Sequence, residues 1–184
     1  MKRLMDILVS ATALILLLPV LIGLMIWIRL DSPGPALFRQ TRIGQMGEPF
    51  TIFKLRSMVQ DAAQRGGYST SRGDARITRA GHFVRRTSLD ELPQLFNVLR
   101  GDMSLVGPRP DTPMQRDNYS AEDWGRRHLV RPGITGLAQA RLRSTASAQD
   151  RLALDLEYVS TASLPRDLAI LLETVRTVIF RKTY

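Results

Sequence analysis

The feature of this sequence that most constrains the fold is a long apolar stretch near its start. No side chain between residues 7 and 28 is charged, and most of them are apolar. At about 1.5 Å per residue, a continuous helix of that length would cross the roughly 30 Å hydrocarbon layer of a bilayer. Residues 20–28 offer no polar face to water, which argues against a core helix of a soluble protein. The sequence therefore predicts a helix that enters a membrane.

A proline, Pro19, lies near the middle of this stretch, and basic residues flank both of its ends. Proline removes one helical hydrogen bond, which here frees the carbonyl of Ile15 and favours a bend. A helix that crosses the membrane would place one basic flank on the outer face, against the positive-inside rule, whereas a re-entrant helix bent at Leu18-Pro19 keeps both flanks inside. On the residues alone, spanning and re-entrant helices both fit. A cleaved signal peptide fits less well, because no small-residue cleavage site follows.

The composition narrows the classes of partner and of chemistry. The 184 residues include 26 Lys and Arg against 17 Asp and Glu, a net charge of +9, so we expect an anionic partner: nucleic acid, a phosphorylated substrate or a membrane surface. Two membrane-seeking segments and few aromatic residues argue against nucleic acid. The absence of cysteine excludes disulfides, a thiol nucleophile and Cys-ligated metals. His82 and His128 are isolated in the sequence, and we interpret both as structural.

Beyond the apolar stretch, short strands and helices follow one another, as expected for one α+β domain. We predict strands at 36–43 and 49–58 that form a hairpin around a turn at 44–47, and a strand at 103–106. We predict helices at 92–99, 120–127, 149–159 and 165–180, a short helix or turn at 79–86, a short helix and a loop within 60–74, and a loop at 131–136. Gly101 is predicted to end the helix before it. The last helix has an apolar band with basic residues around its ends. It fits a helix in the lipid headgroup region, and it equally fits a core helix with a basic tail.

Residues 87–92 read TSLDEL, and the adjacent acids Asp90 and Glu91 have two interpretations. Asp90 is a good N-cap, with Pro93 then in the first turn of the following helix. Alternatively, a carboxylate beside Arg85 and Arg86 lies where phosphate groups also bind, and it can attack phosphorus to give an acyl phosphate. The neighbouring carboxylate would then bind Mg²⁺, which favours one or two carboxylates together with substrate phosphates.

Basic residues near prolines and on a strand are the other candidates. Residues 107–110 read GPRP, and the two prolines restrict the backbone so that Arg109 is directed at a bound anion. Arg131 precedes a Pro-Gly pair and makes a weaker case of the same kind. Lys54 and Arg56 alternate along a predicted strand and would share one face. For each of these residues, an ordinary solvated or structural role fits the pattern as well.

Four stretches of the chain together match one family. They are FKLRSM at 53–58, the long and specific block RRTSLDELPQLFNVLRGDMSLVGPRP at 85–110, VRPGITG at 130–136 and LDLEY at 154–158. With these motifs the whole chain resembles the bacterial sugar transferases, the small monotopic phosphoglycosyl transferases. The resemblance implies a membrane-embedded α+β enzyme on the cytoplasmic face of the inner membrane. It also implies a re-entrant helix broken at a proline within 1–30 and one catalytic domain over 31–184 with a C-terminal interfacial helix, together a minimal catalytic unit.

The resemblance further implies a two-step reaction. Asp90 would attack the β-phosphate of a UDP-sugar, releasing UMP and leaving a phosphosugar on the enzyme. Undecaprenyl phosphate or a similar polyprenol phosphate would then accept the phosphosugar, the first step of a surface polysaccharide or glycoconjugate pathway. Glu91, with Asp90, would bind Mg²⁺. The residues that would bind or support the substrates are Lys54, Arg56, Arg85, Pro108, Arg109, Pro110, Arg131 and Asp155.

One position departs from the family pattern. Family members often have a serine before the helix proline, where its hydroxyl satisfies a freed carbonyl, and this chain has Leu18. Thr12 is a weaker substitute, so the sharpness of the bend is left open. The sequence does not determine the sugar, the pathway or whether the chain forms a homo-oligomer; segments 65–80 and 142–150 are our candidates for sugar specificity. A non-catalytic, membrane-bound anion-binding scaffold is the alternative to an enzyme.

Overall fold

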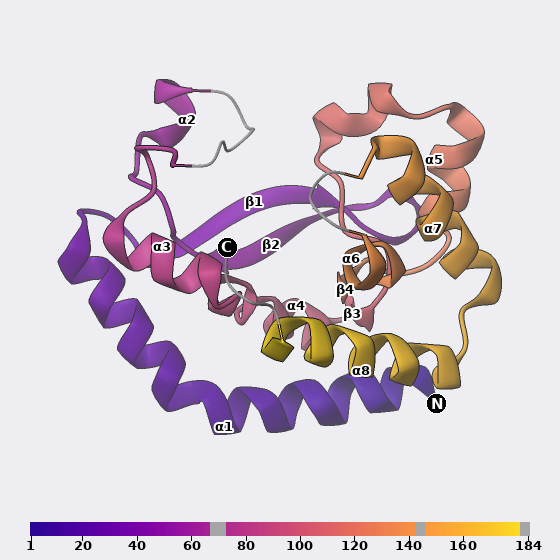
Figure 1. Ribbon diagram of the computed structural model, residues 1–184, viewed down its shortest axis with the longest axis horizontal. Helices are drawn as coiled ribbons and strands as arrows, with labels where there is room; N and C mark the ends of the chain where they lie inside the picture. Colours follow the sequence, from indigo (N-terminus) through magenta and orange to yellow (C-terminus); the bar gives the residue numbers. More distant parts are fainter. Residues whose placement is uncertain (67–72, 143–145, 181–184) are drawn as a thin grey trace.

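The computed structural model describes residues 1–66, 73–142 and 146–180, which form a mixed fold of helices and short strands (Figure 1). The helices are α1 (Lys2–Asp31), α2 (Ala62–Arg65), α3 (Arg79–Arg86), α4 (Gln94–Arg100), α5 (Ala121–Arg127), α6 (Leu137–Arg141), α7 (Ala148–Thr161) and α8 (Leu164–Phe180). The strands are β1 (Leu37–Ile43), β2 (Pro49–Leu55), β3 (Ser104–Val106) and β4 (Gly133–Thr135), and short 3₁₀ helices cover Gln45–Gly47, Leu89–Glu91 and Pro113–Asn118. The predicted α+β class is confirmed.

Two small sheets organise the domain. Strands β1 and β2 form the predicted antiparallel hairpin, with Leu37 opposite Leu55 and Ile43 opposite Pro49. Strand β4 corrects a prediction, because part of the expected loop at 131–136 pairs in parallel with β3. A Cβ atom at Gly133 would lie 2.1 Å from the backbone nitrogen of Gly107. The glycine therefore allows the two backbones to approach each other, and periodicity gives no signal for so short a strand.

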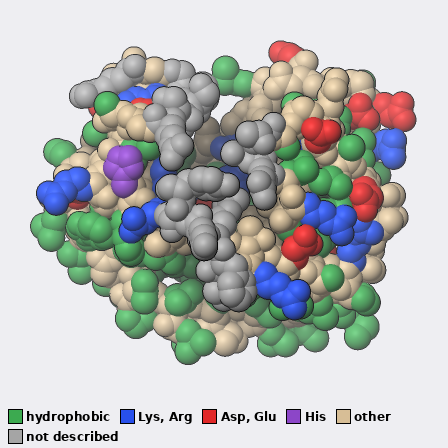
Figure 2. All heavy atoms as spheres, viewed as in Figure 1, with side chains coloured by type: hydrophobic (Ala, Val, Ile, Leu, Met, Phe, Trp, Pro, Cys, Tyr) green, Lys and Arg blue, Asp and Glu red, His purple; other side chains and the backbone are tan. Residues whose placement is uncertain are grey.

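Helix α1 is continuous over 30 residues, with Pro19 inside it, and Figure 1 shows it bent about midway. It is long and apolar enough to cross a membrane, and only 17% of its most apolar window is buried within the protein. Its large exposed apolar side chains are Leu4, Ile7, Leu8, Val9, Ile15, Leu16, Leu18, Val20, Ile22, Ile26, Trp27 and Leu30. Hydrophobic side chains line the lower margin in Figure 2, where α1 runs in Figure 1.

The N-terminal end of α1 is attached to the domain by polar side chains. The carboxylate of Asp6, 1% exposed, accepts hydrogen bonds from the Ser104 hydroxyl and the Leu105 backbone N–H, both at 3.1 Å. Lys2 forms an ion pair with the fully buried Asp167 of α8. Arg3 donates to the carbonyl oxygens of Val98 and Leu99, which belong to the last turn of α4. This end of the helix therefore docks against β3, α4 and α8.

The C-terminal end of α1 is attached to the same domain. The buried guanidinium of Arg56, just after β2, donates to the carbonyl oxygens of Ile28 and Ser32 at 3.1 and 2.7 Å. It thereby adds hydrogen bonds at a helix end, where several carbonyls lack a partner within the helix. Asp31 accepts a hydrogen bond of 2.9 Å from the backbone N–H of Ala80 in α3. Helix α1 thus contacts the rest of the domain at both ends.

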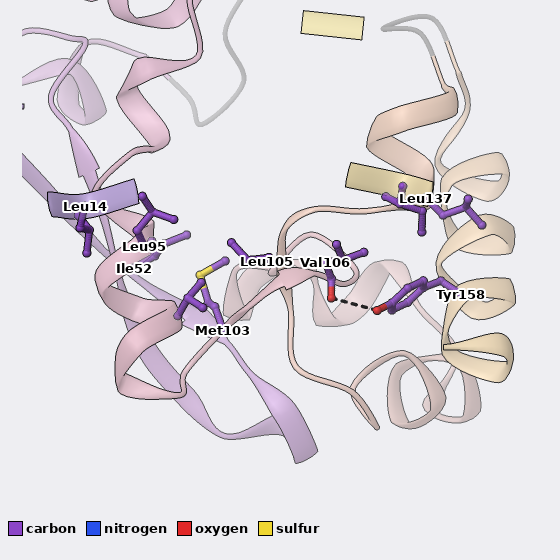
Figure 3. Packing of buried hydrophobic residues seen from close by; sticks show 10 residues of the cluster. Leu14, Ile52, Leu95, Met103, Leu105, Val106, Leu137 and Tyr158 are labelled. Atoms are coloured by element: carbon purple, nitrogen blue, oxygen red, sulfur yellow. Dashed lines mark hydrogen bonds between the residues drawn. The ribbon is translucent and has the colours of Figure 1, made fainter. Parts of the chain in front are cut away.

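The main core lies between the two sheets and the helices around them (Figure 3). Met103, Leu105 and Val106 of the β3 region are almost completely buried, and the hydroxyl of Tyr158 lies 3.0 Å from the Val106 carbonyl oxygen. The buried hydroxyl is also 2.7 Å from an Asp167 carboxylate oxygen, so burial and this carboxylate raise the pKa of Tyr158. Tyr158 therefore connects α7 to β3 and α8.

The helices expected from periodicity are present close to their predicted positions. Gly101 ends α4 at φ +98°, a conformation that glycine adopts without strain, and the Ser120 hydroxyl caps α5. Helix α8 has both a buried and an exposed apolar side. Ile170 is buried in the core, whereas Leu168, Leu172 and Val175 are exposed. It lies beside the N-terminal half of α1 (Figure 1), to which Lys2 and Asp167 join it by an ion pair.

Candidate active site

The adjacent acids lie in a 3₁₀ turn, Leu89–Glu91, rather than at the first position of α4. The turn follows Ser88 at φ +58°, and the backbone N–H groups of Glu91 and Leu92 bond three residues back, to Ser88 and Leu89. Helix α4 begins only at Gln94, with Pro93 at its cap position. The prediction that Asp90 is the N-cap is therefore wrong. Tight winding before the proline places Asp90 a full turn ahead of the helix start.

Glu91 is held by two cations from distant parts of the chain. Lys54 Nζ of β2 and Arg109 Nη2 both donate to Glu91 Oε1, at 2.9 and 2.8 Å. Burial alone would raise the pKa of Glu91, but the positive charges of Arg109 and Lys54 outweigh it and lower the pKa to about 2. Burial and the neighbouring Arg109 lower the pKa of Lys54. Glu91 is thus a fixed carboxylate at physiological pH.

Asp90 is half-buried and differs from its neighbour. Within residues 1–66, 73–142 and 146–180, no hydrogen bond or ion pair engages its carboxylate. Burial, followed by the negative charge of Glu91, raises the pKa of Asp90, while Lys54, Arg85 and Arg109 oppose that rise. A carboxylate with free lone pairs, surrounded by three positive charges, is suited to attack an electrophile that carries negative charge.

Arg127 of α5 holds the backbone of the GPRP segment, which carries Arg109. The Arg127 guanidinium donates to the carbonyl oxygen of Arg109 at 2.8 Å and pairs with Asp111 and Asp155, all three charged side chains being buried. Burial raises the pKa of Asp155, and the charge of Arg127 opposes that rise. On the other side, Arg42 Nη1 donates to the Pro110 carbonyl at 3.0 Å. The backbone around Arg109 is therefore held on both sides.

The structure brings together some of the predicted site residues and not others. Lys54, Arg109 and the two acids meet directly, and Arg85 lies within electrostatic range of Asp90, with its Nε bonded to the Ser57 hydroxyl at 2.8 Å. The contacts of the other predicted residues lie elsewhere: Arg56 caps the end of α1, Arg131 donates to the Gly101 carbonyl, and Asp155 pairs with Arg127. Of the segments expected to set sugar specificity, residues 67–72 and 143–145 lie outside the described residues.

The site offers two carboxylates as donors for a metal ion. Among the described residues there is no group of three or more His, Cys, Asp or Glu side chains placed to hold one. Magnesium does not require such a cage, because it commonly takes one or two carboxylates and completes its octahedron with water and substrate phosphates. Asp90 and Glu91 supply hard oxygen donors on adjacent residues, so the residues present fit Mg²⁺ bound jointly with a phosphorylated substrate.

Reasoning from the sequence missed the residues that support the site. Arg127 gave no signal, since it lies in a run of polar residues, and its two carboxylate partners lie 16 and 28 residues away along the chain. Asp6 did carry a signal, an isolated acid beside the apolar stretch, which in a membrane-seeking helix marks a buried polar partner.

The whole chain is similar to known proteins of one family. A family model described as "Bacterial sugar transferase" matches residues 1–181. A UDP-glucose:undecaprenyl-phosphate glucose-1-phosphate transferase of Caulobacter vibrioides is 48% identical, over 97% of this chain and 69% of its own length. A UDP-N-acetylgalactosamine-undecaprenyl-phosphate N-acetylgalactosaminephosphotransferase of Aeromonas hydrophila is 42% identical, but this chain spans only 43% of it. The exopolysaccharide production protein PSS of Rhizobium leguminosarum bv. phaseoli is 45% identical, over 95% of this chain and 93% of its own length.

Proposed function

This chain belongs to the bacterial sugar transferase family, and we propose that it transfers a phosphosugar from a UDP-sugar to undecaprenyl phosphate or a related polyprenol phosphate. UMP is the second product, and the lipid diphosphate sugar starts a surface polysaccharide or glycoconjugate. The observation that carries the proposal is the unpaired Asp90 carboxylate beside Glu91, which Lys54 and Arg109 hold in place. The relatives transfer different sugars according to their names, so the donor is tested with a panel of UDP-sugars.

The reaction has two displacements at one phosphorus atom. A carboxylate oxygen of Asp90 attacks the β-phosphorus of the UDP-sugar, and the bond from that phosphorus to the bridging oxygen breaks, so that UMP leaves with that oxygen. A phosphate oxygen of the polyprenol phosphate then attacks the same phosphorus. This second attack breaks the acyl-phosphate bond, restores the Asp90 carboxylate and forms the diphosphate.

The positive residues around Asp90 lower the cost of bringing anions together. Asp90, the donor diphosphate and the acceptor phosphate are all negative, so their approach is repulsive without compensating charge. Arg109, half-exposed at the site, is available to a substrate phosphate on the side that Glu91 does not occupy. Arg85 provides a second guanidinium near Asp90. Lys54 fixes Glu91 so that the two acids are not rearranged when substrate binds.

We assign Mg²⁺ to Glu91 and Asp90 together with the donor diphosphate. When bound, the ion would neutralise charge on the diphosphate and on the departing UMP. Manganese, which replaces magnesium at oxygen sites, offers a direct test. The electron paramagnetic resonance signal of free Mn²⁺ should decrease when enzyme and a UDP-sugar are added, and Glu91→Gln should weaken this binding by about tenfold or more. Equal binding by the variant would exclude Glu91 as a ligand.

We also infer that α1 is re-entrant and that the catalytic domain lies on the cytoplasmic face. A straight helix of 30 residues would be about 45 Å long, enough to separate its ends by a whole bilayer. The contacts of Asp6 with β3 and of Asp31 with α3 support the opposite arrangement, because they attach both ends to one domain. The bend about midway in α1 supports the same arrangement (Figure 1).

Incubation with UDP-sugars, Mg²⁺ and polyprenol phosphate tests the function directly. At least one donor should release UMP and yield a lipid diphosphate sugar. Donor alone should leave a phosphosugar on the enzyme, detectable by intact mass, and Asp90→Asn should abolish this adduct because an amide is a poor nucleophile. An adduct that persists in Asp90→Asn would place the nucleophile elsewhere. No release of UMP across a broad donor panel would overturn the enzymatic proposal and favour an anion-binding scaffold.

A further inference from the structure

An open hollow of about 610 Å³ lies against the outer face of α3, apart from the contacts of Glu91. The described residues that line it are Ile77, Arg79, His82, Phe83, Arg85 and Arg86. Its position is fixed by the inner face of the helix, where a Cβ atom at Gly81 would lie only 1.9 Å from the Ser57 carbonyl oxygen. Helix α3 is thus packed tightly on the segment just after β2, with Arg85 bonded to the Ser57 hydroxyl and with Arg79, His82 and Arg86 exposed.

The lining of this hollow carries unbalanced positive charge. Arg79, His82 and Arg86 are exposed, and among the described residues none of their side chains forms an ion pair or a side-chain hydrogen bond. Their spacing places them on adjacent turns of one helix side. In Figure 2, blue and purple side chains gather over α3, directly above hydrophobic side chains at the edge of α1. A cluster of unpaired guanidinium groups is suited to a phosphate.

The hollow lies between the membrane helix and the nucleophile. On one side, Phe83 packs against Trp27 of α1 with ring centroids 5.4 Å apart, and tryptophan is enriched at membrane interfaces. On the other side, Arg85 lines the hollow and also acts electrostatically on Asp90. A ligand with a phosphate head and an apolar tail would meet guanidinium groups at its head and aromatic side chains where its tail begins.

We propose that this hollow, which we call the α3 hollow, is the entry site for the phosphate head of the polyprenol phosphate acceptor. The inference rests on the proposed function and adds a location to it. Arg79, His82 and Arg86 capture the head at the membrane surface, and Arg85 receives the phosphate before it reaches the phosphosugar on Asp90. The tail stays in the lipid beside Trp27 and Phe83, so the acceptor need not leave the membrane.

The double variant Arg79→Gln/Arg86→Gln tests this role, because it removes two charges from the hollow and leaves Arg85 in place. Its KM for polyprenol phosphate should rise by about tenfold or more, since each lost bond is to a charged group. The phosphosugar adduct formed from donor alone should appear at the rate of the unmodified enzyme. The matched control is Arg126→Gln/Arg141→Gln, which removes the same charge from exposed residues of α5 and α6 and should leave the KM unchanged.

Three results would overturn the inference. They are an unchanged KM for the acceptor, an equal loss in adduct formation, and a KM effect that appears only in nanodiscs containing anionic phosphatidylglycerol. The last would assign the α3 hollow to bulk anionic lipid, so the assays are run in neutral phosphatidylcholine nanodiscs and in mixed ones. The unmodified enzyme is assayed for the adduct before the variants are compared. If it forms no adduct with any donor, the proposed function itself fails.

Discussion

Arg127 donates a hydrogen bond to the backbone carbonyl of Arg109, with 2.8 Å between Nη2 and the oxygen. The bond joins a buried charge cluster to the active site. Behind Arg127 are the carboxylates of Asp111 and Asp155, from the segment after GPRP and from α7. Asp155, expected from the family resemblance among the substrate-binding residues, thus reaches the site through Arg127. We interpret Arg127 and Asp155 as positioning residues for Arg109.

The variant Arg127→Lys tests this interpretation. Lysine keeps the charge, but its single ammonium group cannot serve two carboxylates and a carbonyl in the planar geometry of the guanidinium. Arg109 would then be less well placed, and we expect the rate of adduct formation to fall about 10- to 100-fold. Rapid-quench measurement of the adduct gives this rate. The neighbouring variant Arg126→Lys, at an exposed position, is the matched control.

A double-mutant cycle separates positioning from general destabilisation. If Arg127 acts through Arg109, then Arg127→Lys should have little further effect in an Arg109→Ala background. Additive losses would mean that Arg127 supports the fold only. A melting temperature measured for each variant shows whether the cycle compares folded proteins.

The pH dependence of donor turnover should report the ionisation of Asp90. Its pKa is raised above the ordinary value of 3.8, chiefly by burial and then by the charge of Glu91. Because the carboxylate is the nucleophile, kcat/KM for the UDP-sugar should fall on the acid side through a pKa above 3.8. Glu91→Gln removes a charge that raises this pKa and should move the acid limb to lower pH. Lys54→Met removes a charge that lowers it and should move the limb upward; shifts in the same direction would contradict the assignment.

The stabilisation that the ionised Glu91 gives the folded protein should be lost in acid. Its pKa falls from 4.5 to about 2 on folding, so the unfolded chain binds the proton more readily than the native protein does. The resulting stabilisation, on the order of 3 kcal/mol, is complete above pH 4.5 and is lost as the pH falls toward 2. Tryptophan-fluorescence melting in detergent should show this loss in the native protein and a smaller one in Glu91→Gln. Glu122→Gln, at an exposed ion pair, should behave like the unmodified protein.

The sequence predicts what depends on local patterns. Four features follow from residues within a few positions of each other, and all are present. They are the β1–β2 hairpin, the apolar stripe of α4, the end of α4 at Gly101 and the Ser120 cap of α5. The incorrect prediction of Asp90 as the N-cap also came from a local pattern, which could not show that a 3₁₀ turn precedes Pro93. Strand β4 is too short for an alternation of apolar and polar residues to be recognised in the sequence.

The long-range contacts of the site had no local signature. Lys54 and Glu91 are 37 residues apart, and Asp6 and Leu105 are 99 residues apart. Periodicity assigns Lys54 and Arg56 to one face, yet the strand ends at Leu55, and Arg56 turns to the end of α1. Three-dimensional packing determines which arginines remain for a substrate: the end of α1 engages Arg56, and the Gly101 carbonyl engages Arg131.

The position of α1 in the membrane leads to the last prediction, and the absence of cysteine makes it straightforward to test. Single cysteines are introduced by inserting one directly after Met1, at the start of α1, and by Glu48→Cys at the hairpin turn. If the helix is re-entrant, a membrane-impermeant maleimide should label both positions in inverted membrane vesicles and neither in intact spheroplasts. Labelling of the first from outside and of the second from inside would mean that α1 spans the bilayer.

A third cysteine, Leu16→Cys, tests whether the exposed surface of α1 is in lipid. The Leu16 side chain is 71% exposed in the isolated protein, so in water a cysteine there should react as readily as one at Glu48. In membranes it should react from neither side, because the hydrocarbon layer excludes both the charged reagent and the thiolate. Detergent micelles should protect it in the same way. Rapid labelling of Leu16→Cys in intact vesicles would place this face of the helix in water, and α1 would then have to be covered by something other than lipid.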